Sequence, residues 1–415
     1  MTVPEICLAA RQASRELALL TRQRKDEALG LVADALERRA AEIMRENSED
    51  MTLARADRLP GDMIDRLLLD EDRMAEMIAS VRAVATLEDP IGTVARGWRL
   101  PNGLDVRKER VPLGVVAVIY EARPNVTVDA AALCLKTGNA VILRGGSAAK
   151  HSNRILAEVV QGAIITAGLP RAAVSHLPVE RELLTELLQQ RDTVDLVIPR
   201  GGEDLKDYLV ENSRIPVIYA AGGNCHVYVD AAADLDKAQR ITINAKCQRP
   251  GVCNAAEPLL VHRAVAEEFL PTIIAELTKR GVELAVDKTT ATIVNDSSLK
   301  RASKTHYATE FLSMKMAIRT VDSLDEAIEH IATYGTGHSE AIVSEDLAAA
   351  RAFTQRVDAA CVYVNASTRF TDGGQFGLGA EMGISTQKLH ARGPIALEEL
   401  TCTKYVLWGD GQVRG

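Results

Sequence analysis

The sequence predicts an α/β protein with two parallel-sheet domains, of which the first is Rossmann-like. From Val111 onward, short continuous apolar runs alternate with helical segments, which is typical of buried parallel strands covered by helices. Glycine-rich turns follow several of these apolar runs. The length of 415 residues also exceeds what one hydrophobic core usually holds.

The first hundred residues are predicted to be helical, because apolar side chains recur there at spacings of three, four and seven residues. The apolar face comprises Leu29, Val32, Leu36 and Ile43. Glycine and proline interrupt this pattern at residues 97–103. We therefore expect turns before the first sheet begins.

Strands and helices are expected to alternate in two blocks that follow. In the first block, strands are predicted at residues 115–120, 140–143, 196–198 and 217–219, and helices at residues 127–137, 151–167 and about 204–212. In the second block, helices are predicted at residues 236–245, 264–280, 324–334 and 347–357, and strands at residues 259–261, 341–343 and 362–364. This order indicates one helix-covered sheet in each block.

The composition is that of an ordinary globular protein, with 47% hydrophobic and 26% charged residues. A net charge of -8, without a basic run that carries aromatic residues, argues against nucleic-acid binding. We expect a cytoplasmic protein, because the N-terminus lacks a signal-peptide pattern and no apolar run reaches the length of a membrane span. Seven scattered cysteines predict reduced thiols, and neither cysteine nor histidine spacing indicates a metal site.

Three small-residue turns follow predicted strands of the first block. The turn at residues 144–147 places an arginine at a strand end, where its guanidinium could pair with ribose or phosphate oxygens. The alternative is a glycine turn with a surface arginine. The turn at residues 199–202 precedes a helix whose backbone N–H groups could face a pyrophosphate, and the third turn occupies residues 220–224. No Gly-x-Gly-x-x-Gly fingerprint is present, which disfavours an ordinary Rossmann dehydrogenase.

Cys253 is the candidate nucleophile. Pro250 and Gly251 precede it and predict a tight turn between a helix and an apolar run that begins at Leu259. A loop between rigid elements is a common place for a reactive side chain. The alternative is that Cys253 is a small buried hydrophobic residue, which is the commoner role of a cysteine.

Longer segments of the chain resemble the aldehyde dehydrogenase superfamily. They are residues 120–129, 136–146, 248–255, 337–343, 364–370 and 376–385, and they follow the family order over essentially the whole chain. Within the superfamily, the chain is similar to members that reduce an acyl phosphate. The resemblance implies an aldehyde-dehydrogenase-like fold, with a Rossmann-like cofactor domain, a catalytic domain and a small β flap for oligomerisation.

The resemblance assigns chemistry to two residues. Cys253 would attack the acyl carbon, and its surroundings must favour the thiolate, for which Arg249 is a candidate. The side-chain amide of Asn125 and the backbone N–H of Cys253 would form the oxyanion hole. The alternative for Asn125 is a turn former after Pro124.

Three departures from the superfamily refine this expectation. Hydrolytic members carry a glutamate base where this chain has Ala220, followed by Ala221, so the resemblance implies a reductase that releases an aldehyde. NAD-preferring members carry an acidic residue where this chain has Ser147, and a serine would not repel a 2′-phosphate, so NADPH is the expected cofactor. Cys247 stands where a threonine is expected and could place a second thiol near the nucleophile, but an inert packing role is the expected one.

The cofactor site implied by the resemblance combines the three turns with a distant glutamate. Its residues are Arg144, Gly145, Gly146, Ser147, Gly201, Gly202, Gly222 and Glu310. Glu310 would hold the nicotinamide ribose. The alternative for Glu310 is a solvated charge at the end of a helix.

The implied reaction is the NADPH-dependent reduction of L-glutamyl 5-phosphate to L-glutamate 5-semialdehyde and phosphate, the second step of proline biosynthesis. Arg369 would anchor the distal end of the substrate, because an arginine fork suits a carboxylate. Arg123 or Lys246 would meet the leaving phosphate. The alternatives are a hydrolytic aldehyde dehydrogenase and a catalytically inactive nucleotide-binding subunit.

The resemblance also implies domain boundaries and partners. The cofactor domain would comprise residues 1–104 and 121–226, the catalytic domain residues 227–388, and the flap residues 105–120 and 389–415. In the superfamily such a flap adds to the sheet of a neighbouring subunit, so a homodimer or homotetramer is expected. We expect the glutamate 5-kinase that supplies the substrate to be a separate protein in transient contact with this one.

Overall fold

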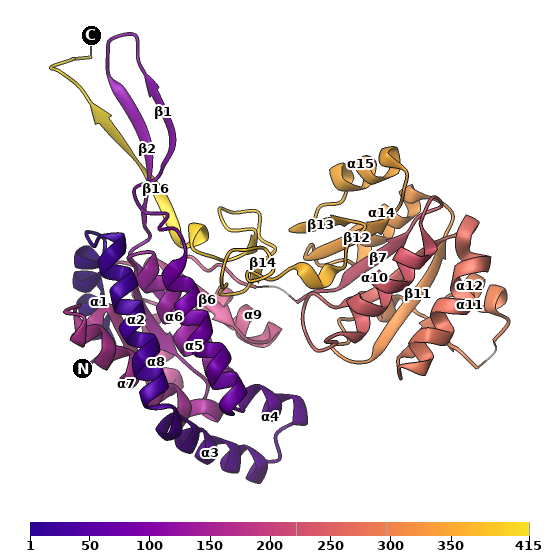
Figure 1. Ribbon diagram of the computed structural model, residues 1–415, viewed down its shortest axis with the longest axis horizontal. Helices are drawn as coiled ribbons and strands as arrows, with labels where there is room; N and C mark the ends of the chain where they lie inside the picture. Colours follow the sequence, from indigo (N-terminus) through magenta and orange to yellow (C-terminus); the bar gives the residue numbers. More distant parts are fainter. Residues whose placement is uncertain (221, 297, 415) are drawn as a thin grey trace. The chain divides into compact units, whose positions relative to one another are not determined.

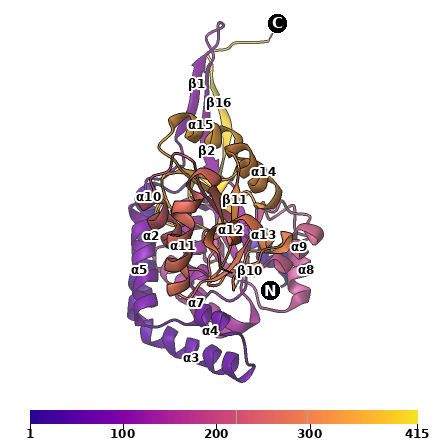
Figure 2. The ribbon, with the colours of Figure 1, turned by 90° about the vertical axis from the view of Figure 1, so that its right-hand side faces the viewer.

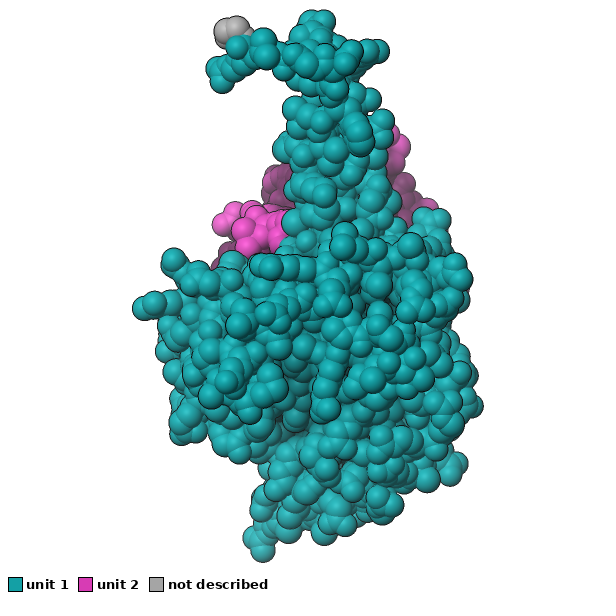
Figure 3. Space-filling view, turned by 90° about the vertical axis from the view of Figure 1, so that its left-hand side faces the viewer, with its two compact units in different colours: residues 1–219, 377–383, 395–415 teal, residues 220–376, 384–394 magenta. Residues whose placement is uncertain are grey.

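The structure, a computed structural model, describes residues 1–220, 222–296 and 298–414. The chain divides into two compact units, shown in different colours in Figure 3. Unit 1 comprises residues 1–219, 377–383 and 395–415, and unit 2 comprises residues 220–376 and 384–394. The α/β fold class with two parallel sheets and a small antiparallel sheet is confirmed.

The sheet of unit 1 has four parallel strands in the order β5-β4-β3-β6. The strands are β3 (Val115–Tyr120), β4 (Ala140–Arg144), β5 (Val174–His176) and β6 (Leu196–Arg200). Every residue of the central strand β3 is buried, as its continuous apolar sequence predicts. The strand expected at residues 217–219 is reduced to a single bridge between Val217 and Val197, since Pro216 has no N–H with which to extend the pairing.

Nine helices accompany this sheet in the described part of unit 1 (Figure 1). They are α1 (Val3–Leu17), α2 (Arg22–Arg38), α3 (Ala40–Ala56), α4 (Gly61–Leu67), α5 (Glu71–Thr86), α6 (Asn125–Lys136), α7 (Lys150–Thr166), α8 (Arg181–Leu187) and α9 (Glu203–Asn212), with short 3-10 turns at Ser147–Ala149, Arg171–Ala173 and Glu398–Leu400. Side-chain caps begin several of them: Thr2, Thr21 and Asp70 each accept a hydrogen bond from a backbone N–H of the first turn.

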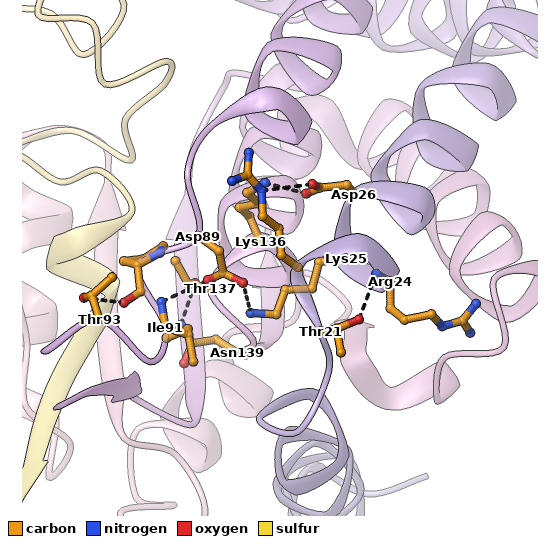
Figure 4. A network of polar contacts seen from close by, with 12 residues as sticks. Thr21, Arg24, Lys25, Asp26, Asp89, Ile91, Thr93, Lys136, Thr137 and Asn139 are labelled. Atoms are coloured by element: carbon orange, nitrogen blue, oxygen red, sulfur yellow. Dashed lines mark hydrogen bonds and ion pairs between the residues drawn. The ribbon is translucent and has the colours of Figure 1, made fainter.

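Two buried lysines form ion pairs that fix helix α2 within unit 1 (Figure 4). Lys25 of α2 is 2% exposed and pairs with Asp89 at 2.6 Å. Lys136, at the end of α6, pairs with Asp26 of α2. Both ammonium groups have carboxylate partners, as buried charges require. The helices between residues 3 and 86 are therefore anchored to the core of unit 1 through Lys136 of α6.

A three-stranded antiparallel flap projects from unit 1, at the end opposite α3 (Figures 1 to 3). Its strands are β1 (Val94–Arg99), β2 (Asp105–Pro112) and β16 (Thr401–Trp408), in the order β1-β2-β16. The sequence predicted β2 and β16 but not β1, whose glycine at position 97 indicated a turn. The predicted flap boundaries differ from the structure, because residues 115–120 form the buried strand β3.

The sheet of unit 2 has seven parallel strands in the order β10-β9-β11-β8-β7-β12-β13. They are β7 (Cys225–Val229), β8 (Ala256–His262), β9 (Glu283–Val286), β10 (Lys300–Arg301), β11 (Lys315–Val321), β12 (Ser339–Val343) and β13 (Cys361–Val364). A two-stranded ribbon, β14 (Ile384–Ser385) and β15 (Gly393–Pro394), lies beside the turn at Ala220 through a bridge to Ser385. The sequence predicted only the strands around residues 259, 341 and 362.

Helices cover both faces of this sheet. They are α10 (Leu235–Cys247), α11 (Arg263–Lys279), α12 (Lys288–Val294), α13 (Lys304–Ala308), α14 (Leu324–Tyr334) and α15 (Leu347–Arg356), with a 3-10 turn at Thr368–Phe370. Neighbouring residues of one strand enter different cores: Val227 packs with α10 and α11, whereas Tyr228 packs with α14 and α15. No helix in the described residues is long and apolar enough to cross a membrane.

Candidate active site

Cys253 lies on the eight-residue loop between the end of α10 and the start of β8 in unit 2, and it is partly buried. The thiol of Cys225, the first residue of β7, donates to the Cys253 carbonyl at 3.1 Å. On its other side, the neighbouring Asn254 donates from Nδ2 to the Thr371 carbonyl at 2.8 Å. The Asn254 carbonyl accepts from the Thr368 hydroxyl at 2.7 Å. The loop is therefore fixed from two directions, as a presented nucleophile requires.

The turn at residues 222–224 presses against this loop. A Cβ on Gly223 would overlap with the carbonyl of Cys253, so only glycine fits there. Gly222 beside it is partly buried. Ala220 precedes the turn and pairs with Ser385, and its methyl group supplies no general base. Ala221 lies outside the described residues.

Glu310 lies next to the same turn. Its Oε1 accepts a hydrogen bond from the Gly223 N–H at 2.7 Å, and its side chain is partly buried. Helix α13 ends at Ala308, before Glu310. This contact favours a role in the site over a solvated charge at a helix end.

Arg369 belongs to the 3-10 turn at Thr368–Phe370. It reaches the loop at residues 248–255, named the nucleophile loop after its candidate nucleophile Cys253. Its Nε donates to Gln248 Oε1 at 2.9 Å, and its Nη1 donates to Asn254 Oδ1. Burial, and then the positive charge of Arg249, lower the pKa of Arg369, whereas the charge of Asp372 and then that of Cys253 raise it. The guanidinium therefore lies within electrostatic reach of Cys253 and offers donors to a carboxylate.

The buried position of Lys246 contradicts its predicted contact with the leaving phosphate. The side chain is 0% exposed, and its Nζ donates to Glu257 Oε2 at 2.5 Å. Burial lowers the pKa of Lys246 and raises that of Glu257. The sequence missed this pairing, since the partner lies eleven positions away across the nucleophile loop.

Cys247 does not share the environment of Cys253. It is partly exposed and lines a cavity of about 500 Å³ with Arg240, Arg280, Gln239, Ile243, Asn244 and Gln248. Burial raises the pKa of the Cys247 thiol. It is therefore a protonated side chain at neutral pH, which agrees with an inert packing role.

In unit 1, Arg144 ends β4 and is partly buried. Its Nη2 donates to the Val179 carbonyl at 2.5 Å, while its Nε is buried without a hydrogen-bond partner among the described residues. Burial lowers the pKa of Arg144, and the nearby charge of Glu180 raises it. Ser147 is exposed at the start of the following 3-10 turn. An unsatisfied guanidinium N–H and an exposed hydroxyl fit an anionic group such as a cofactor phosphate.

Packing within unit 1 already requires glycine at three of the proposed cofactor positions. A Cβ on Gly145 would overlap with Asn153, and one on Gly146 would approach the backbone of Glu121. A Cβ on Gly201 would approach the Glu121 carboxyl group, whose Oε2 accepts from the Gly202 N–H at 3.1 Å. The N-terminus of α9, expected to face a pyrophosphate, therefore already holds a carboxylate. This finding contradicts the expectation that the Gly202 donor is available to the cofactor.

Asn125 begins α6, and its Nδ2 donates to Asp129 Oδ2 at 2.8 Å. One amide hydrogen remains for another acceptor. Burial raises the pKa of Asp129 to about 6, while the bond from Asn125 and the charge of Arg200 lower it. Arg123, two residues earlier, is partly buried. Sequence reasoning missed Asp129, because the predicted helix began at residue 127, whereas α6 begins at Asn125 and places the two residues four positions apart on one helix.

The two helix-covered sheets, the antiparallel flap and the cysteine loop define an aldehyde dehydrogenase fold. The chain belongs to the aldehyde dehydrogenase family, whose model matches residues 1–310 and 316–406. This finding confirms the resemblance seen in the sequence.

Two curated relatives and one crystal structure that are similar to this chain share one enzyme name. The gamma-glutamyl phosphate reductase of Heliobacterium modesticaldum is 54% identical over 406 residues, which are 98% of this chain and 97% of that protein. The protein of the same name from Thermobifida fusca is 52% identical over 413 residues, which are 99% of this chain and 98% of that protein. The crystal structure of gamma-glutamyl phosphate reductase from Thermotoga maritima is 45% identical, has a TM-score of 0.97 and covers 100% of both chains.

Proposed function

We propose that this protein is a gamma-glutamyl phosphate reductase, which converts L-glutamyl 5-phosphate to L-glutamate 5-semialdehyde and phosphate in the second step of proline biosynthesis. The observation that carries the proposal is identity of 54% with a relative of that name over 98% of the chain. Similarity over the full length includes both units and the nucleophile loop. Ala220 supports the same reaction, because a side chain without a carboxylate cannot activate water to hydrolyse a thioester.

Cys253 carries the covalent step. The thiolate sulfur attacks the acyl carbon of the substrate, the carbon–oxygen bond to phosphate breaks, and a thioester on Cys253 forms as phosphate leaves. A nicotinamide cofactor, when bound, would supply the hydride that reduces the thioester carbon. Collapse of the resulting thiohemiacetal breaks the carbon–sulfur bond, releases the aldehyde and returns the electron pair to the Cys253 thiolate.

Asn125 and Arg369 are proposed to stabilise charges on the substrate. The second amide hydrogen of Asn125 would donate to the oxygen that becomes negative during attack, and Asp129 would keep that amide correctly oriented. The Arg369 fork would bind the α-carboxylate of the glutamyl group. Arg123 remains the candidate for the leaving phosphate.

The family implies a nicotinamide cofactor, and we propose NADPH in particular. Arg144 and Ser147 support this choice, because their donors suit a 2′-phosphate. The charge of Glu180 lies near Arg144 and opposes an anion there, so the arginine must outweigh it. Gly145, Gly146, Gly201 and Gly222 would shape the backbone beside the cofactor, and Glu310 would hold the nicotinamide ribose.

The protein is proposed to act in the cytoplasm as a homodimer or homotetramer. The flap supports self-association, because Trp98, Tyr405, Leu407 and Trp408 expose large side chains on its strands. Trp98 and Tyr405 pack edge to face, with ring centroids 6.3 Å apart. A separate glutamate 5-kinase would supply the acyl phosphate.

Phosphate dependence tests the proposed function. Purified protein is given L-glutamate 5-semialdehyde and NADP+, and NADPH formation is followed with and without inorganic phosphate. An acyl-phosphate reductase needs phosphate in this reverse direction. A hydrolytic aldehyde dehydrogenase does not need it, and an inactive subunit forms no NADPH in either case.

A further inference from the structure

Glu257 connects segments on both sides of the nucleophile loop. It is the second residue of β8, four positions after Cys253, and its side chain is 0% exposed. Its Oε2 accepts from Lys246 Nζ at 2.5 Å, at the end of α10. Its Oε1 accepts from the backbone N–H of Leu312 at 3.1 Å. Each carboxylate oxygen therefore binds a different part of unit 2.

The backbone at Leu312 needs such a partner. Its φ angle is 50°, in the left-handed region that is unfavourable for a residue with a branched side chain. Conformations of this kind persist where neighbouring groups hold them, and they gather at functional sites. The hydrogen bond from Leu312 N–H to Glu257 acts directly on this strained residue.

The strained residue lies two positions after Glu310. Glu310 in turn accepts from the Gly223 N–H at 2.7 Å, and Gly223 abuts the Cys253 carbonyl. The contacts thus run from Glu257 through Leu312 to Glu310, and through Gly223 back to the loop of Cys253. A shift of Leu312 would move Glu310 relative to the nucleophile.

We infer that Glu257 is a positioning residue, whose carboxylate holds Leu312 in its left-handed conformation and thereby sets Glu310 beside the nucleophile loop. Glu257 is fully buried and acts through Leu312 and Lys246. The inference rests on the proposed function, in which Glu310 holds the nicotinamide ribose. Lys246, set aside above as a phosphate contact, acquires a role here: its ammonium binds the Glu257 carboxylate and lowers the pKa of Glu257, which burial raises to about 7.

Two substitutions separate positioning from stability. Glu257→Gln keeps an oxygen that can accept from Leu312 N–H, whereas Glu257→Ala removes it. Both leave the Lys246 charge without its carboxylate, so both should lower the melting temperature. The NADP+ dissociation constant, measured by fluorescence titration, should rise about tenfold in Glu257→Ala and little in Glu257→Gln, a loss of about 1.4 kcal/mol.

A third substitution, Leu312→Gly, tests the backbone directly. Glycine adopts a positive φ without help, so Leu312→Gly in the Glu257→Ala background should recover most of the lost NADP+ affinity. The matched control is Asp230→Asn, which changes another buried carboxylate of unit 2, held by Tyr228 at 2.9 Å and Ser344 at 2.7 Å beyond the far end of β7. It should lower stability and leave NADP+ affinity unchanged.

Glu257→Ala with wild-type NADP+ affinity would overturn the inference, and so would the absence of rescue by Leu312→Gly. If Glu257→Ala does not fold, hydrogen exchange of the wild-type peptide covering residues 310–312 decides. Slow exchange of the Leu312 amide is expected, and exchange at the unprotected rate would overturn the inference. Exchange needs neither substrate nor cofactor, so an enzyme inactive on L-glutamate 5-semialdehyde would refute the proposed function and leave this test intact.

Discussion

The backbone N–H of Gly223 donates a hydrogen bond to Oε1 of Glu310 at 2.7 Å. The same glycine lies so close to the Cys253 carbonyl that a Cβ on it would overlap with that oxygen. One residue without a side chain therefore supports the nucleophile loop and holds a glutamate of the proposed cofactor site. Glycine is needed at this position because the Cys253 carbonyl leaves no space for a side chain, and not because of backbone flexibility.

Gly223→Ala should displace the nucleophile loop. The methyl group has no space beside the Cys253 carbonyl, and overpacking of this kind costs about 1–3 kcal/mol of stability. Turnover should fall by about 100-fold, because the loop also carries the backbone donor of the proposed oxyanion hole. Urea denaturation and steady-state kinetics measure the two effects. The control is Gly162→Ala in α7, where a Cβ meets open space and stability should rise slightly. Wild-type turnover in Gly223→Ala would contradict the proposed loop geometry.

Asp129 should impart a pH dependence to turnover. It faces Asn125 on its own helix, Ser80 of α5 at 3.5 Å and the charge of Arg200 at the end of β6. Ionised Asp129 only accepts hydrogen bonds, so it fixes the direction of the Asn125 amide. As pH falls through about 6, protonation should release that amide and lower turnover. Asp129→Asn should be about tenfold slower at neutral pH, and the ratio of wild-type to variant rates should fall below pH 6. A constant ratio would remove Asp129 from this role.

Asp129 also predicts how the stability of the fold depends on pH. Its contribution to stability should fall as pH rises, whereas turnover should rise. Burial raises the pKa of Asp129 above its ordinary value of 3.8 to about 6, so the folded protein binds this proton more tightly than the unfolded chain. The stability contribution of the protonated carboxyl is complete below pH 3.8 and is lost as pH rises through 6. The difference in unfolding free energy between wild type and Asp129→Asn, measured between these pH values, should therefore become less favourable to wild type as pH rises.

Arg369→Ala should weaken substrate binding more than it slows turnover. An arginine bonded to a carboxylate contributes about 1.5–3 kcal/mol, so the Michaelis constant for L-glutamate 5-semialdehyde should rise about 10- to 100-fold. Arg369→Lys should restore binding only partly, because a lysine cannot form the fork. The control is Arg263→Ala, which removes an exposed ion pair with Asp322. An unchanged Michaelis constant in Arg369→Ala would exclude this residue from the substrate site.

Ser147→Glu should shift cofactor preference from NADPH towards NADH. The added carboxylate would repel a 2′-phosphate near Arg144 and could accept the ribose hydroxyls of NADH. The ratio of kcat/KM with NADPH to that with NADH should fall at least about tenfold. A matched substitution, Ser147→Gln, adds similar bulk without the charge and should change the ratio much less. If both variants behave alike, Ser147 does not select the cofactor.

The sequence predicted those strands that are continuously apolar, such as residues 115–120. It missed β7 and β11, in which polar residues interrupt the apolar run. His226 in β7 is fully buried because Glu340 accepts from its backbone N–H at 2.8 Å and binds its ring at 2.9 Å. A partner 114 positions away cannot be read from local periodicity.

The candidate site likewise contains features that local sequence predicted and features that depend on distant partners. The glycine and proline around Cys253 identified its loop from local sequence, and family resemblance supplied roles for Asn125 and Glu310. Neither source indicated that Lys246 would be fully buried against Glu257, or that Glu121 would occupy the N-terminus of α9. Both depend on pairs formed only when separate segments fold together.

The phosphate dependence of the reverse reaction tests the central claim most directly. Wild-type protein and Cys253→Ser are incubated with L-glutamate 5-semialdehyde and NADP+, and NADPH absorbance is recorded as inorganic phosphate is raised from zero. The account predicts that wild-type protein forms no NADPH without phosphate and forms it saturably with phosphate, and that Cys253→Ser forms none at any phosphate concentration. NADPH formation by the wild type at zero phosphate would contradict the account and indicate that water resolves the Cys253 thioester.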